Sequence, residues 1–184
     1  MYKRQIKKFF KVKDELGLSD TTVYLNVSAH TIMHQEFCKI FSRFVEENGI
    51  KENEFGLEIT ETAELEDTKK AGESLERLKK RGIKIALDDF GAGYASLKYI
   101  RDLPIDVVKL DRHFTSNISD PSTSRLIKFV SDVCAELNLE MIGEGIETEK
   151  EKNMMIELGC VTGQGFLMHM PSFIEDIKKE NNDG

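Results

Sequence analysis

Short runs of apolar and β-branched residues alternate along this chain with longer segments in which apolar residues recur at helical spacing. The short runs have the length and composition of strands buried in a sheet. Six of them predict strands, at Val23–Val27, Leu57–Thr60, Ile83–Asp88, Val107–Asp111, Glu140–Gly145 and Gln164–Met168.

The segments between these runs have the pattern of amphipathic helices, in which one face is apolar. One apolar stripe is formed by Phe37, Phe41, Phe44 and Val45, and another by Leu126, Val130, Val133 and Leu137. Gly82 and Gly159 each follow an expected helix end, where glycine commonly adopts the left-handed conformation of a cap. A further helix is expected over Lys3–Leu16.

Alternation of strand and helix predicts a parallel sheet with helices packed outside it. An open doubly wound sheet and a closed barrel both fit this pattern. Polar residues at the strand ends favour the barrel, because strands arranged in a ring bring their C-terminal ends to one mouth. Six runs are fewer than the eight strands of a complete barrel. We therefore expect an α/β fold of the TIM type, a (β/α) barrel that is incomplete, as one domain over residues 1–178 with a frayed tail at 179–184.

The composition limits the kinds of partner that this protein can bind. The 184-residue chain has a net charge of −7, which argues against binding to a nucleic acid polymer or to an anionic membrane. No apolar run approaches the ~20 residues of a membrane span. The three cysteines lie far apart without zinc-site spacing, which is typical of buried thiols in a reducing compartment. These features predict a cytoplasmic protein.

Polar side chains recur at or just after the C-terminal ends of the expected strands. They are Asn26, Glu58, Glu61, Asp88, Asp89, Lys109, Asp111, Glu144, Glu147 and Gln164. Charges inside apolar strands are unfavourable unless they are paired or bound to metal. Several acids aimed at one mouth repel each other, and divalent cations relieve that repulsion. Hard oxygen ligands of this kind favour Mg²⁺ or Mn²⁺ over zinc.

Each of these residues also has a simpler structural interpretation. Glu61 and Glu147 can cap the helices that follow them, where carboxylates are favoured. Lys109 and Asp111 share one face of a strand and can form an internal ion pair. A single amide at a strand end is more often a turn residue than a ligand. The recurrence of polar residues from strand to strand is the observation that predicts a site.

The sequence resembles the EAL domain family, bacterial barrel phosphodiesterases that open cyclic di-GMP to linear pGpG. The motifs that carry the resemblance occur in family order and span nearly the whole chain. They are Asn26-Val27-Ser28, Glu58-Ile59-Thr60-Glu61, Asp88-Asp89-Phe90-Gly91-Ala92-Gly93-Tyr94, Lys109-Leu110-Asp111, Glu144-Gly145-Ile146-Glu147 and Gln164-Gly165-Phe166, followed by Pro171. The resemblance implies a hydrolase in bacterial signal transduction that acts on cyclic di-GMP with two Mg²⁺ or Mn²⁺ ions.

The resemblance also implies roles for single residues. Asn26, Glu58 and Asp88 match metal ligands, with Asp88 at the position that bridges two ions. Asp89 matches a ligand of the second ion. Lys109 matches the catalytic residue that holds the attacking water and helps to deprotonate it.

Other matched positions lie around this centre. Glu144 and Gln164 match positions that contact water, metal or substrate at the mouth. Glu147 matches a glutamate that braces the loop after the two aspartates, and we group it with Glu144 among the catalytic residues. Asp111 and Glu61 are assigned, together with Gln164, to substrate binding.

One family motif has no counterpart in this sequence. The family is named for Glu-Ala-Leu on an early strand, whose Glu is a metal ligand and whose neighbouring Arg contacts a substrate phosphate. The resemblance therefore implies an N-terminally truncated member with impaired turnover. The alternative is a catalytically inactive module that binds cyclic di-GMP or a protein partner. The open edges of an incomplete barrel predict a homo-oligomer, since unpaired strand edges invite pairing with another chain.

Overall fold

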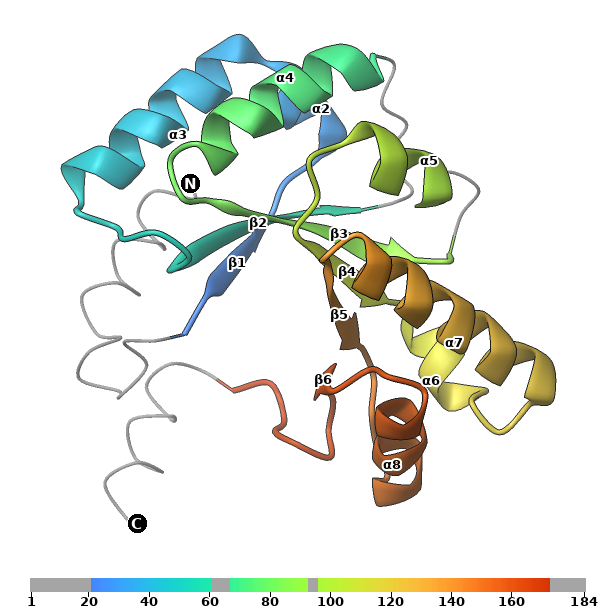
Figure 1. The fold of residues 1–184 in the computed structure, drawn as a ribbon. Coiled ribbons are helices and arrows are strands. Elements are labelled where there is room, and N and C mark those ends of the chain that lie inside the picture. The colour runs from blue at the N-terminus through green and yellow to red at the C-terminus, as the bar shows by residue number, and fades with distance from the viewer. Residues whose placement is uncertain (1–20, 61–66, 93–95, 173–184) are drawn as a thin grey trace, which may run out of the picture.

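A computed structural model describes residues 21–60, 67–92 and 96–172. Strands and helices alternate through this part of the chain (Figure 1). The elements are β1 (Val23–Asn26), α2 (Ala29–Met33), α3 (Gln35–Glu47), β2 (Phe55–Thr60), α4 (Thr68–Lys79), β3 (Lys84–Phe90), α5 (Ser96–Asp102), β4 (Val107–Leu110), α6 (Arg112–Ser116), α7 (Pro121–Glu136), β5 (Glu140–Gly143), α8 (Glu149–Glu157) and β6 (Thr162–Gly163).

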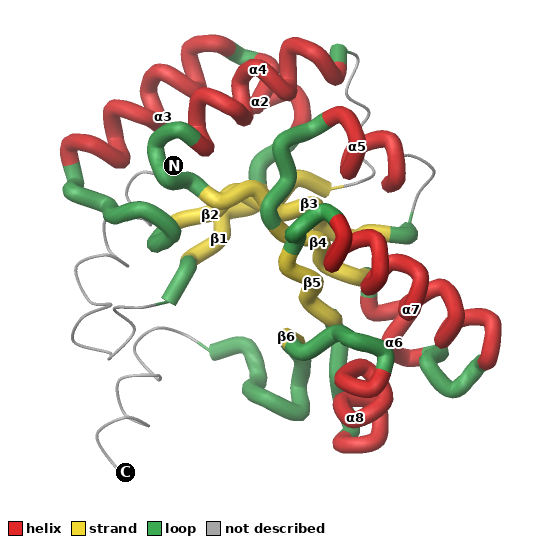
Figure 2. Tube along the Cα trace, in the orientation of Figure 1, coloured by secondary structure: helices red, strands yellow, loops and turns green. Residues whose placement is uncertain are grey.

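The described strands form one parallel sheet of six strands in the order β1-β2-β3-β4-β5-β6. The helices lie along one side of the curved sheet (Figure 2). This arrangement confirms the predicted incomplete α/β barrel. No helix in the described ranges is long and apolar enough to cross a membrane.

The two faces of the sheet differ in chemistry because side chains alternate along each strand. The convex, helix-covered face is apolar, and fully buried side chains such as Leu57, Ile85 and Leu110 belong to the hydrophobic core. The alternate positions, among them Glu58 and Lys109, point to the concave face. This alternation gathers the polar side chains on one surface.

Helix α3 has the predicted inner face, with Phe41, Phe44 and Val45 buried. The predicted face of α7 is wrong. Leu126 and Leu137 are 54% and 52% exposed.

The buried residues of α7 are Ile127, Val130, Ser131 and Cys134. Two overlapping stripes with helical spacing run along α7, and tertiary contact selects the second. Ser131 packs directly against Gly159, where a Cβ would collide with the Ser131 hydroxyl. Gly82 and Gly159 have φ of 75° and 95°, as predicted for helix caps.

The predicted strand Gln164–Met168 is also wrong. Pairing with β5 is limited to β6, and the backbone after it turns around Ile146. The Ile146 N–H donates to the Gln164 carbonyl at 3.1 Å, and the Leu167 N–H donates to the Ile146 carbonyl at 3.1 Å. A Cβ at Gly165 would collide with the Ile146 backbone, so the segment wraps closely only because this residue is glycine.

The remaining predicted strands differ from the observed ones only at their ends. β2 begins two residues earlier, at Phe55, and β3 runs on to Phe90. β4 ends at Leu110 because Asp111 caps the next helix. The expected helix Lys3–Leu16, Glu61 and the tail at 179–184 lie outside the described residues.

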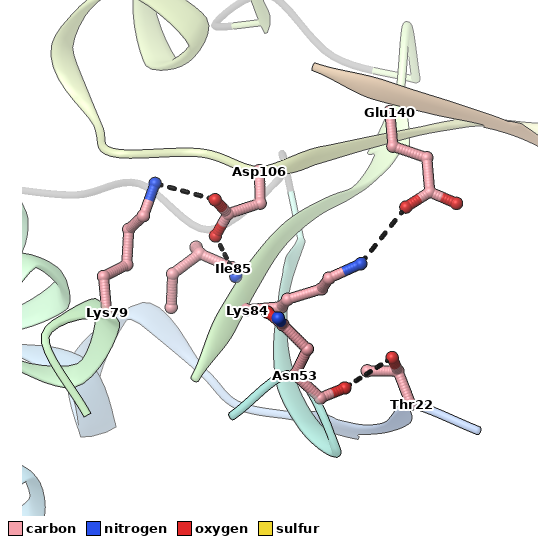
Figure 3. Close-up of polar contacts among 7 residues, drawn as sticks. All are labelled: Thr22, Asn53, Lys79, Lys84, Ile85, Asp106 and Glu140. Atoms are coloured by element: carbon pink, nitrogen blue, oxygen red, sulfur yellow. Dashed lines mark hydrogen bonds and ion pairs between the residues drawn. The ribbon is translucent and has the colours of Figure 1, made fainter. Parts of the chain in front are cut away.

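Polar contacts also connect segments at the N-terminal ends of the strands (Figure 3). Lys84 on β3 pairs with Glu140 on β5 at 3.4 Å. Asp106 pairs with Lys79 at 2.8 Å and accepts a hydrogen bond from the Ile85 N–H, also at 2.8 Å. These contacts hold the loops before β3, β4 and β5 against one another.

Candidate active site

Lys109 occupies the centre of the concave face near the C-terminal ends of the strands. Its Nζ lies 2.7 Å from Glu58 Oε1, 2.9 Å from Asp88 Oδ1 and 2.8 Å from Glu144 Oε1. The three acids come from β2, from β3 and from the residue that follows β5. One ammonium is thus shared by three carboxylates from three different segments.

All four side chains are largely shielded from water. The Lys109 side chain is 6% exposed, and those of Glu58, Asp88 and Glu144 are 11%, 13% and 15% exposed. Burial alone lowers the pKa of Lys109, but the hydrogen bonds it donates to Glu144, Glu58 and Asp88 outweigh burial and hold its pKa above the usual value. Lys109 is therefore a charged, fixed donor.

Glu144, the acid that follows β5, has a raised pKa. Burial raises its pKa, the Lys109 ammonium opposes that rise, and the carboxylates of Asp88 and Asp89 add to it. Gln164 Nε2 donates to Glu144 Oε1 at 2.6 Å. The amide thus fixes the orientation of the Glu144 carboxylate.

Asp88 and Asp89 reach the same side of the sheet because the strand is irregular between them. Adjacent residues of a regular strand point to opposite faces. Here the β3–β4 register shifts between Leu87 and Phe90, which places one extra residue on β3, and Asp89 has a φ of 55°. The carboxylate oxygens of Asp88, Asp89 and Glu144 consequently lie within 4.8 Å of one another.

This donor set fits a hard divalent cation. It offers carboxylate oxygens from three residues, one of them buried and two half-buried, with a net negative charge that Lys109 offsets only in part. Oxygen ligands of this type suit Mg²⁺, Mn²⁺ or Ca²⁺. No histidine or cysteine belongs to the cluster, so its chemistry does not favour zinc.

Asn26 ends β1 directly beside Glu58 in the strand register, which places it on the same face and at the same end of the sheet. It is more exposed than the acids. The structure thus groups four predicted ligand positions, Asn26, Glu58, Asp88 and Asp89, along three neighbouring strands.

Asp111 does not pair with Lys109, so the alternative of an internal ion pair between them is wrong. The Asp111 carboxylate accepts a hydrogen bond from the His113 N–H at 2.7 Å and caps α6. Glu147 is exposed, and its N–H donates to Glu151 Oε2 at 2.9 Å. Thr148 and Glu151 form the N-terminal cap of α8. Glu147 lies just before this cap and does not itself cap the helix.

A cleft of about 770 Å³ opens beside the acidic cluster. Asp89, Asp111, Glu144, Glu147 and Gln164 line it, so five predicted site residues share one cavity.

Three further lining residues, Arg112, Phe166 and Met170, were missed by the sequence analysis. Two of them adjoin recognised motifs, since Arg112 follows Asp111 directly and Phe166 completes Gln164-Gly165-Phe166. Their position next to these motifs was the feature of the sequence that could have identified them as site residues. An acidic centre beside a cleft with a cation and an aromatic ring can accept a ligand that has both phosphate and ring groups.

A family model described as the EAL domain matches residues 2–171 of this chain. The chain is 32% identical over 152 residues to the probable cyclic di-GMP phosphodiesterase PdeI of Escherichia coli, covering 83% of this chain and 19% of the relative. It is 38% identical over 149 residues to the cyclic di-GMP phosphodiesterase PdeA of Borreliella burgdorferi, covering 80% and 22%. The chain thus spans about a fifth of the length of these relatives.

Solved structures resemble the fold closely. The EAL domain of Mycobacterium smegmatis DcpA has a TM-score of 0.82 at 29% identity, covering 89% of this chain and 74% of that one. The PaMucR phosphodiesterase, solved as a cyclic di-GMP complex, has a TM-score of 0.81 at 29% identity, covering 95% and 70%. Klebsiella pneumoniae BlrP1, solved with manganese and cyclic di-GMP, has a TM-score of 0.77 at 25% identity, covering 86% and 41%.

Proposed function

Because the chain belongs to the EAL domain family, we propose that it acts on cyclic di-GMP as a metal-dependent phosphodiesterase and opens it to linear pGpG. The observation that carries this proposal is the Lys109 ammonium held by three carboxylates beside the Asp88–Asp89–Glu144 cluster. Relatives named as cyclic di-GMP phosphodiesterases support the choice of substrate.

We assign Mg²⁺ or Mn²⁺ to the concave face, with Asp88, Asp89, Glu58 and Asn26 as ligands and the Glu144 carboxylate within reach of the two aspartates. The donor atoms are oxygens throughout, and the residues neighbour each other across β1, β2 and β3. Bound metal ions would supply the positive charge that stabilises the attacking and leaving oxygens of an in-line displacement.

The chain's own residues would position the substrate and the water. Lys109 Nζ, held protonated, would donate hydrogen bonds to the attacking water or to phosphate oxygens of the substrate. Glu144, oriented by Gln164, is placed to accept the proton that the attacking water releases. The water oxygen bonds to phosphorus, the bond from phosphorus to a ribose 3′ oxygen breaks, and that oxygen takes up a proton to become the 3′ hydroxyl of linear pGpG.

The cleft residues would hold the remainder of the dinucleotide. Asp111 and Gln164 line the cleft with Arg112 and Phe166. Guanidinium groups match phosphate geometry, and aromatic rings stack on bases. We keep Glu61 as a proposed substrate contact on its motif alone, since it lies outside the described residues.

The direct test is incubation with cyclic di-GMP and Mn²⁺, with detection of pGpG by chromatography. We expect pGpG to form and to disappear in Lys109→Ala, whereas Lys84→Ala, at the other end of the sheet, keeps the activity. Cyclic di-GMP bound without turnover would instead support the inactive binding module. If the protein neither binds nor hydrolyses cyclic di-GMP, the proposal is refuted.

We also propose that the protein forms a homo-oligomer in the cytoplasm. Among the described strands, β1 and β6 are the sheet edges, and Val161 beside β6 is 79% exposed. Open edges with exposed apolar neighbours favour pairing with another chain. All three cysteines are free and buried, as suits a reducing compartment. Light scattering at micromolar concentration tests the assembly, and a stable monomer would refute it.

A further inference from the structure

A second cavity lies on the opposite side of the sheet from Lys109. Helices α3 and α4 run side by side on the convex side (Figure 1), and a groove of about 480 Å³ opens between them. Its charged lining residues are Lys39, Arg43, Glu46, Arg77, Lys80 and Arg81. Five cations thus share one groove with a single acid.

This concentration of positive charge contrasts with the chain as a whole, which has a net charge of −7. Glu46 forms an ion pair with Arg81, so the one acid is already matched. Arg43, Arg77 and Lys80 form no ion pair with any residue that the structure describes. Three cations in the groove therefore lack a neutralising partner within these residues.

Helix electrostatics explain only part of this arrangement. Basic side chains near the C-terminus of α4, such as Arg77 and Arg81, interact favourably with the partial negative charge of that helix end. Lys39 on α3 pairs with Glu36 on the same helix. Arg43 lies in the middle of α3, where no helix-end effect applies, so its approach to the groove from a second helix requires another account.

The floor of the groove is a buried contact between α3 and α4. Cys38 is 3% exposed, and its Sγ lies 3.8 Å from the Ile32 carbonyl and 3.9 Å from that of Ser74, which tethers α3 to α4. Ser74 and Leu78 are also buried at this contact. The two helices that carry the cations are thus packed together before any ligand arrives, and a site formed in advance lowers the entropic cost of binding.

We propose that the groove between α3 and α4 binds a small anion with two or more phosphate groups, such as an inorganic polyphosphate or a nucleoside triphosphate. Guanidinium groups present planar donor pairs that match phosphate oxygens, and three of the five cations are arginines. The groove is a concave pocket whose volume suits a ligand of nucleotide size rather than a protein surface.

The test is calorimetric titration of the whole protein with sodium tripolyphosphate in low salt and EDTA. Without divalent ions the acidic mouth repels anions, so the outcome does not depend on the proposed phosphodiesterase activity. We expect saturable binding that weakens about tenfold or more in the double variant Arg43→Ala/Arg77→Ala. No binding would overturn the proposal.

A charge-matched control separates the site from general electrostatic attraction. Lys128→Ala/Lys152→Ala removes two exposed cations from α7 and α8, and it should change the affinity less than about twofold. Equal weakening by both double variants would refute a specific site.

A gain of binding is expected from Glu46→Gln, which removes the acid of the groove and frees Arg81. A tighter complex supports the site even if the double arginine variant fails to fold. An unchanged or weaker complex contradicts it.

Two more titrations identify the ligand. GTP that binds more tightly than tripolyphosphate would assign the groove to nucleotides, and equal affinity would assign it to the phosphate chain. A decaglutamate peptide that binds as tightly as tripolyphosphate would overturn the assignment to phosphate.

Discussion

At the N-terminal end of the sheet the charged side chains pair one to one, whereas at the C-terminal end one lysine is shared by three carboxylates. Lys84 pairs with Glu140, and Lys79 pairs with Asp106 (Figure 3). These side chains are 28% to 40% exposed, while Lys109 is 6% exposed.

The difference shows what each end contributes. Pairs exposed to water stabilise a protein weakly and leave no charge to bind a ligand. The buried group around Lys109 retains an excess of negative charge, which is unfavourable without a cation. We therefore expect variants at the C-terminal end to alter binding and activity, and matched variants at the N-terminal end to alter stability alone.

The largest effect is expected from Asp88→Asn, which removes the charge of one of the two acids that pair with Lys109 and also belong to the carboxylate cluster. The shift in melting temperature that millimolar Mn²⁺ produces should disappear. The matched variant Asp106→Asn should keep the shift. A full Mn²⁺ shift in Asp88→Asn would remove the proposed distinction between the ends.

A large loss of stability is expected from Lys109→Met in EDTA. Removing one partner of a buried ion pair leaves uncompensated charge and costs about 3 kcal/mol or more in the free energy of unfolding. Lys84→Met, which removes one half-exposed pair, should cost less than about 1 kcal/mol. Urea unfolding measures both, and Mn²⁺ should restore part of the Lys109→Met loss. Equal losses for the two variants would contradict the comparison.

A moderate effect is expected from pH, because the pKa of Glu144 is raised in the folded protein. A raised folded pKa contributes stability that is fully present below the unfolded value and is lost as pH rises through the folded pKa. In EDTA, the stability of the native protein relative to Glu144→Gln should therefore fall as pH rises above about 4.5. Urea unfolding between pH 4 and 8 tests this, and a relative stability that rises with pH would refute it.

The smallest effects on stability concern two hydrogen bonds of equal length. Thr22 Oγ1 donates to the Asn53 carbonyl at 2.6 Å, and Gln164 Nε2 donates to Glu144 at 2.6 Å. Thr22→Val and Gln164→Met should each cost about 1 kcal/mol or less. Only the Gln164 variant should weaken Mn²⁺ binding in calorimetry. The same Mn²⁺ affinity in both variants would show that orienting Glu144 is unimportant.

The sequence predicted five of the six strands and the grouping of their polar ends because both depend on local pattern. Alternation of apolar and polar residues identifies a strand and its inner face, and parallel strands must bring their C-terminal ends to one edge. Asn26, Glu58 and Lys109 were placed correctly by this reasoning alone.

The errors arose where a tertiary contact chose between locally equivalent options. Either apolar stripe of α7 could face inward, and in the packed structure it is the stripe of Ile127, Val130 and Cys134 that is buried. Lys109 could pair with Asp111 or with acids on neighbouring strands, and capping of α6 removed Asp111. No periodicity in the sequence marks these choices.

The extra residue between Leu87 and Phe90 has a consequence for how this gene can vary. Both residues belong to the hydrophobic core although they are three positions apart, which ordinary strand alternation would forbid. Deleting either codon between them would restore regular alternation, keep Phe90 on the core face and leave one aspartate instead of two at the cation site. Point mutation can therefore alter each aspartate separately, whereas a one-codon deletion would remove the extra residue and one of the two neighbouring carboxylates together.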